Sequence, residues 1–155
     1  MDHAHQVLPR LADRADIARP SWRIAVVVDP SLPRGLLANT VAAIAVGIGA
    51  AEQSLGNAIL TDGLGRSIHN SSNLPVPILE APAEAIGALL MKALPGPDGA
   101  RIVAFPQRAR ALHAFADYAA LFPTLDLAGE TIEGLGLAGP DKWVRSLTGS
   151  LKLLR

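Results

Sequence analysis

Two runs of aliphatic residues, each followed by a helical stretch, constrain the fold of this chain most. The first run, residues 24–28, reads Ile-Ala-Val-Val-Val, which is typical of a strand buried on both faces of a sheet. A long helical stretch follows at residues 36–51. The pattern repeats with a strand at residues 102–105 and a helix at about 108–121. This alternation of strands and helices predicts an α/β domain.

The remaining segments complete the layers of such a domain. The sequence predicts short strands at residues 58–60 and 76–79, a helix from residue 82 to residue 94, and a last strand at residues 132–137. We therefore expect a single domain with a four- or five-stranded mixed sheet and helices on both faces.

Two apolar segments also indicate how the layers pack. The helix at residues 36–51 is apolar nearly all round, so we expect it to be largely buried. The last strand contains Gly134 and Gly136, which predict that a neighbouring element passes close by. A final helix has Asp141 in its first turn, where a negative charge is favoured, and is expected to end at Thr148 and Gly149.

Composition excludes several classes of function. The 14 basic and 14 acidic residues cancel, which argues against strong nucleic-acid binding, and the absence of cysteine excludes thiol catalysis and cysteine-zinc sites. No signal-peptide pattern and no run of 18 apolar residues occurs, so we expect a cytoplasmic protein that does not enter the membrane. Zero net charge and a chain that is 50% apolar favour self-association, and we expect a homodimer.

Residues 1–21 have mixed charges and few apolar side chains, and we interpret them as an N-terminal extension. The domain is then predicted to span residues 22–155. Its last part, residues 136–154, combines an apolar strand, a Gly-Pro pair, a short helix and the sequence Leu-Thr-Gly-Ser-Leu-Lys-Leu-Leu.

This C-terminal order resembles the type II peptidyl-tRNA hydrolases, which end in a Gly-rich strand, a Gly-Pro turn and Val-Thr-Gly-X-Leu-Lys-Leu. It is more similar still to a bacterial family with that fold that is catalogued as a domain of unknown function. The resemblance implies a type II peptidyl-tRNA hydrolase-like fold and a homodimer. It covers residues 23–51 and 124–155 well, and the middle of the chain only in the order of its elements.

The resemblance fails where the hydrolases carry their polar groups. Asp29 and Gly35 match the hydrolase pattern, but Leu36 stands at its lysine, Thr40 at its glutamine and Ala43 at its histidine. Ester hydrolysis needs a group that positions water and a charge that stabilises the oxyanion, and Leu36 supplies neither. We therefore expect a protein without that hydrolase activity, which binds a small ligand or a protein partner.

The expected ligand site lies where the first strand ends, because ligands of open α/β sheets favour that edge. Its candidate residues share polar chemistry or a match to the family pattern, and the fold is expected to bring the last helix nearby: Asp29, Gly35, Asn39, Thr40, Asp141 and Thr148. Ordinary capping and turn chemistry is the alternative explanation for Asp29 and Asn39. No cofactor or metal site is expected.

Two further hypotheses remain open. The chain is a hydrolase of peptidyl-tRNA or a related ester with rearranged groups, using Asp126, Thr131 or Thr148, or it is a purely structural subunit. Arg101, Arg108 and Arg110 form a basic group in the sequence, which binds a phosphate-bearing ligand if they share one face and is otherwise solvated surface.

Overall fold

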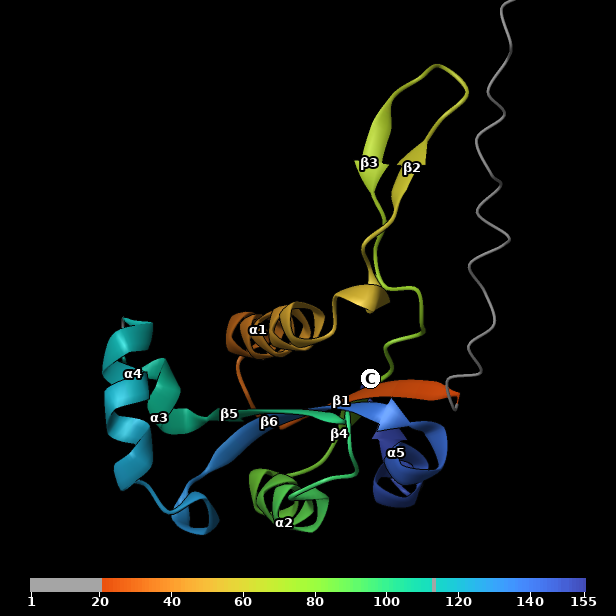
Figure 1. Ribbon diagram of the computed structural model, residues 1–155. Helices are drawn as coiled ribbons and strands as arrows, with labels where there is room; N and C mark the ends of the chain where they lie inside the picture. Colours follow the sequence, from red (N-terminus) through yellow and green to blue (C-terminus); the bar gives the residue numbers. More distant parts are fainter. Residues whose placement is uncertain (1–20, 113) are drawn as a thin grey trace, which may run out of the picture.

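A five-stranded mixed sheet divides the molecule into two layers of helices (Figure 1). The computed structural model describes residues 21–112 and 114–155. The strand order is β5-β6-β1-β4-β7, in which β1 is parallel to β4 and the other neighbours are antiparallel. The strands of this sheet are β1 (Trp22–Val28), β4 (Ile78–Glu80), β5 (Arg101–Pro106), β6 (Ile132–Pro140) and β7 (Lys152–Leu153).

The helices cover both faces of the sheet, as predicted. In Figure 1, α1 lies on one face, α2 and α5 lie on the other, and α3 and α4 lie at one end. Their bounds are α1 (Arg34–Ala51), α2 (Ala83–Ala93), α3 (Gln107–Arg110), α4 (Phe115–Leu121) and α5 (Asp141–Thr148). Short 3-10 turns join them: η2 (Gln53–Leu55), η3 (Phe122–Thr124) and η4 (Leu127–Gly129).

The alternation of side chains along β1 gives the sheet two separate apolar cores. Ile24 and Val26 pack with Ile44 and Ile48 of α1 on one face. Ala25 and Val27 contribute to the core beneath α2 and α5 on the other face. This two-residue period is the reason why one unbroken aliphatic run serves both layers.

The glycines of β6 let α1 approach the sheet closely, as the sequence predicted. A β-carbon placed on Gly134 would lie 2.6 Å from Cγ2 of Thr40, and one on Gly136 would overlap Ile44. Leu135 and Leu137, which alternate with these glycines, point into the opposite core. β6 therefore has one flat face for α1 and one aliphatic face for α2.

Several predicted elements need correction. The expected burial of residues 36–51 is wrong, because α1 buries only Thr40, Ile44 and Ile48, and no described helix or strand covers its outer side. The strand expected at 58–60 belongs to a separate hairpin of β2 (Ile59–Thr61) and β3 (Ser67–His69). The helix expected at 108–121 is divided into α3 and α4, since helical spacing of apolar residues does not report where a chain turns.

One observation concerns helix α1, and another concerns the predicted N-terminal extension. Helix α1 has the length and apolar composition of a membrane-crossing helix, and one side of it, with Ile44 and Ile48, packs on the sheet. The predicted N-terminal extension, residues 1–21, falls almost wholly outside the described residues.

Candidate ligand site

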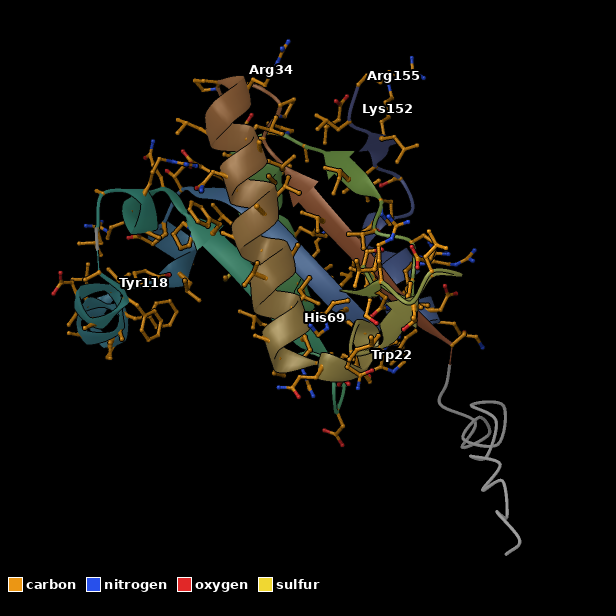
Figure 2. All side chains as sticks on the ribbon, turned by 90° about the horizontal axis from the view of Figure 1, so that it is seen from above. Trp22, Arg34, His69, Tyr118, Lys152 and Arg155 are labelled. Carbon is orange, nitrogen blue, oxygen red and sulfur yellow. The ribbon has the colours of Figure 1, made fainter. Side chains whose placement is uncertain are left out.

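A cavity of about 590 Å3 lies between the C-terminal end of α1 and the base of the β2–β3 hairpin. Figure 2 looks down on α1, with Arg34 at one end of the helix and His69, at the hairpin base, near the other end. The floor of the cavity includes Ile24 of β1 and Ile48 of α1. Ala45, Val46 and Gly49 of α1 form one wall, and Gln53, residues 55–57 and residues 70–72 form the other.

A chain of amide hydrogen bonds fixes the hairpin base against the body. Asn70 accepts from the Ala58 backbone N–H through Oδ1 (2.9 Å) and donates from Nδ2 to Oδ1 of Asn73 (2.6 Å). Asn73 in turn donates from Nδ2 to the carbonyl oxygen of Ser54 (2.8 Å). The polar sequence Asn70-Ser-Ser-Asn73 thus builds the wall of the cavity from side chains that satisfy backbone groups.

The chemistry of the cavity is apolar with a few free polar groups. None of its lining residues is charged. The side chains of Gln53, Asn57 and Ser71 line it and make no hydrogen bond to another described residue. Ligand sites in proteins commonly have this size and an apolar lining with a few polar groups. The arrangement can therefore hold a small uncharged molecule and orient one polar end of it.

The edge that the sequence predicted is occupied by a hydrogen-bonded cluster. Thr40 is fully buried, donates to the carbonyl oxygen of Leu36 (2.8 Å) and accepts from Nη2 of Arg110 (2.9 Å). Arg110 also donates to Oε2 of Glu133 from Nε (3.1 Å) and from Nη2, and its guanidinium lies 5.0 Å from the ring centre of Phe105. Its Nη1 is buried and makes no hydrogen bond among the described residues.

The other candidates at this edge have ordinary roles or open surroundings. Asp29 follows β1, and its Oδ1 accepts from the backbone N–H of Ser31 (2.8 Å), which is the turn chemistry of the alternative explanation. A β-carbon placed on Gly35 would have no described atom within 4 Å beyond its own chain neighbours, and Asn39 is exposed on α1. The structure thus brings Asp29 and Thr40 to one end of β1, with Asn39 turned to solvent.

Asp141 and Thr148 do not lie at that edge, which corrects the expected neighbourhood. β6 is antiparallel to β1 and pairs Pro140 with Trp22, so the chain returns to the start of β1. Asp141 accepts there from Nε of Arg23 (2.7 Å) and of Arg145 (2.8 Å). The hydrogen bond from Arg23 is the main reason why the pKa of Asp141 is lowered. Thr148 is buried and donates to the carbonyl oxygen of Val144.

The basic group of the sequence does not form a shared anion site. Arg101 pairs with Glu52 (3.2 Å) and Arg108 with Glu130 (3.0 Å), while Arg110 pairs with Glu133. Each arginine is therefore neutralised by its own carboxylate. Among the described residues, no three histidines, aspartates or glutamates come together as potential metal ligands.

Sequence reasoning missed both the cavity and the Arg110–Glu133 pair. The polar loop at residues 70–73 was visible, but nothing in the sequence placed it opposite the end of α1. Glu133 lies in an otherwise apolar strand, and a lone acidic residue there was the available signal for a buried partner.

Comparisons with known proteins agree with this fold. A solved structure described as a protein of unknown function, Atu0240 from Agrobacterium tumefaciens strain C58, superposes with a TM-score of 0.76. It is 20% identical, and the alignment covers 85% of this chain and 96% of that one, so the likeness concerns the fold alone. No curated protein sequence matches the chain.

The expectation that the chain belongs to a family of unknown function is confirmed. These comparisons give no evidence for the resemblance to peptidyl-tRNA hydrolases. The model of one family, described as "Protein of unknown function (DUF2000)", matches residues 22–155. The chain therefore belongs to the DUF2000 family.

Proposed function

We propose that this protein is a cytoplasmic binding protein for a small, uncharged and mainly apolar molecule, held in the cavity between α1 and the hairpin base. The observation that carries the proposal is the cavity itself, which has a volume of about 590 Å3 and no charged lining residue. Burying a charged ligand there would leave its charge without a partner, which is costly. Gln53, Asn57 and Ser71 offer donors and acceptors to an amide, hydroxyl or carbonyl group.

The scaffold is, in this proposal, that of the type II peptidyl-tRNA hydrolases without their chemistry. The order of elements supports it, from the first strand and helix to the glycine-containing β6 and the closing α5 and β7. At the positions that match the hydrolase's polar groups, Leu36 and Ala43 are exposed apolar residues, and Thr40 accepts a hydrogen bond from Arg110. These groups give no means to activate water.

The rearranged-hydrolase hypothesis has less support. Asp126 is exposed and accepts from the backbone N–H of Ala128 (3.0 Å), which caps η4. Thr131 precedes β6 at the end of the sheet where β1 ends, whereas Thr148 lines a hollow with Arg23 and Ala25 near the start of β1. A catalytic site needs its groups around one reacting atom, and Thr148 lies at the other end of the sheet from Thr131.

A matched pair of probes tests the proposed ligand chemistry. Octanamide and octanoate have the same chain, but only octanoate carries a charge at pH 7. We expect octanamide to bind with a dissociation constant roughly tenfold lower or better, which corresponds to about 1.4 kcal/mol. Isothermal titration calorimetry measures both. Equal affinities, or tighter binding of octanoate, would contradict an uncharged site.

Two glycine variants on one helix locate the binding site. Gly49 lines the cavity and Gly35 lies at the sequence-predicted edge, and both have open space where a β-carbon would be. Gly49→Leu should fill the cavity mouth and abolish octanamide binding, whereas Gly35→Leu should bind as the parent does. The reverse result would move the site to the edge beside Asp29.

A further inference from the structure

The face of α1 that points away from the sheet is apolar and uncovered by the described part of the chain. The helix has no charged residue between Arg34 and Glu52, and its exposed positions there are apolar except Asn39; they include Leu36, Ala42, Ala43, Val46, Gly49 and Ala50. Val46 is 72% exposed. In Figure 2, which views this face, no other described helix or strand lies across α1. A surface helix ordinarily turns charged or polar residues to water, so this face lacks the chemistry of a solvated one.

The β2–β3 hairpin is a second apolar surface on the same side of the molecule. Figure 1 shows it projecting from the body on the α1 side of the sheet. Every residue of its two strands is exposed, and Leu60 faces Ile68 across the ladder. Its tip is ordered by Asp62, which accepts from the backbone N–H groups of Leu64 and Arg66 (2.9 Å each). A two-stranded hairpin alone is marginally stable in water, so this hairpin, called the arm below, needs a surface to pack on.

We propose that a second copy of this chain covers both surfaces, through a two-fold interface in which the α1 faces meet and each arm packs on the other copy. An isologous interface requires a self-complementary patch, and the uncharged face of α1 carries no like charges that would repel across a two-fold axis. The small residues of this face permit close approach of two helices.

The exposed face of α1 is too small to form a stable interface by itself, so the arm has to contribute. The exposed face of α1 and the arm together are called the patch below. A helix of 18 residues is about 27 Å long and about 10 Å wide. Its face of about 270 Å2 supplies only a third of the roughly 800 Å2 that each partner buries in a stable interface. The arm adds further apolar area, since Leu60 and Ile68 are exposed on one of its faces and Leu64 is exposed at its tip.

A lipid surface is the competing occupant, and charge argues against it. Membrane-binding apolar faces are ordinarily flanked by clustered lysines and arginines. Around this patch, α1 carries a single arginine at its start, and Arg66 of the arm pairs with Asp62 (2.7 Å). The second copy therefore fits the patch better than an anionic membrane does.

The interface also has a consequence for the cavity, although it does not require a ligand. Ala45, Val46 and Gly49 belong both to the cavity wall and to the exposed side of α1. A second copy seated on this face covers the cavity from the solvent side.

Analytical ultracentrifugation of the full chain between 1 and 100 µM tests the proposal. We expect the parent to sediment with twice its chain mass of 16.1 kDa. Val46→Lys on α1 and Ile68→Lys on the arm, which is 66% exposed, should each raise the dimer dissociation constant at least 100-fold. The melting temperature of the parent should also rise with protein concentration, and that of the two variants should not.

Phe115→Lys is the matched control, because Phe115 is an 82% exposed apolar residue on α4, outside the patch. It should leave the dimer intact. A parent that is monomeric at 100 µM, a dimer that survives both patch substitutions, or a dimer that only Phe115→Lys dissolves would overturn the proposal. A monomer that co-sediments with phosphatidylcholine vesicles would assign the patch to lipid instead.

Discussion

At the scale of single residues, the Arg110–Glu133 pair is the most consequential polar feature. Glu133 is 5% exposed in a strand that is otherwise apolar, and burial of a carboxylate is tolerated when it is paired and hydrogen-bonded. Arg110 supplies that pairing and also joins Thr40 of α1 to the sheet. The pair thus connects α3, α1 and β6 at the end of the sheet where β1 ends.

A double-mutant cycle on this pair should show strong coupling. Glu133→Gln leaves a partly buried guanidinium without its counter-charge, so we expect it to lower the free energy of unfolding by roughly 3 kcal/mol. Together with Arg110→Met, the cycle should give a coupling energy of about 2 kcal/mol, measured by urea denaturation. The neighbouring pair Arg108–Glu130, whose arginine is half exposed, is the control and should give a clearly smaller coupling energy. Equal coupling in the two pairs would show that burial is not the cause.

At the scale of elements, the start of α5 is held to the start of β1 by charge. Asp141 stands in the first turn of α5, where the helix dipole favours a carboxylate, and binds Arg23 of β1 and Arg145 of its own helix. These contacts lower its pKa. A carboxylate with a lowered pKa in the folded state stabilises the fold above its unfolded pKa and loses that contribution as the pH falls through the folded pKa.

Asp141→Asn should therefore be destabilising in a pH-dependent way. We expect the variant to be less stable than the parent at pH 7, and the difference to shrink as the pH falls below about 4. Urea denaturation at pH values from 7 to 2.5 measures the difference. Asp98→Asn removes a carboxylate that makes no ion pair with another described residue, and it is the control, which should lose less stability at pH 7 than Asp141→Asn. A constant deficit for Asp141→Asn would assign its effect to packing.

The elements also show what sequence reasoning can and cannot reach. The strands at residues 24–28 and 102–105 were predictable because a buried strand reads as an unbroken aliphatic run. Residues 36–51 were correctly predicted as a helix, but their burial was not. An apolar helix that is covered on one side can have the same composition as a helix that is covered on both sides. The two-residue strand β7 was missed, since it exists only through its pairing with β4.

The candidate site was less predictable than the fold. Asp29 and Thr40 were correctly expected at one edge, because both follow the first strand closely in sequence. Asp141 was misplaced because its position depends on the antiparallel direction of β6, which composition does not reveal. The cavity depends on where the hairpin base meets α1, a contact between segments that no local pattern specifies.

At the scale of the whole molecule, the described residues form a sheet with a layer of helices on each face. Both apolar cores are built from residues 22–151, and the first residue of β1, Trp22, already pairs with Pro140 and packs on the α1-side core. The backbone N–H of Asp141 donates to the carbonyl oxygen of Ser21 (2.7 Å). The family match begins at residue 22 as well. From these limits we propose that the domain starts at about Ser21.

Two truncations test that boundary. A chain that starts at Ser21 after an initiating methionine keeps every strand pairing, so we expect its melting temperature to stay within about 2 °C of the parent's at equal concentration. A chain that starts at Ile24 loses Trp22 and the Arg23–Asp141 ion pair, and it should melt about 5 °C lower or more. Differential scanning calorimetry separates the outcomes. If both truncations melt equally low, residues 1–20 contribute to the domain, because loss of β1 residues cannot then explain the difference from the parent.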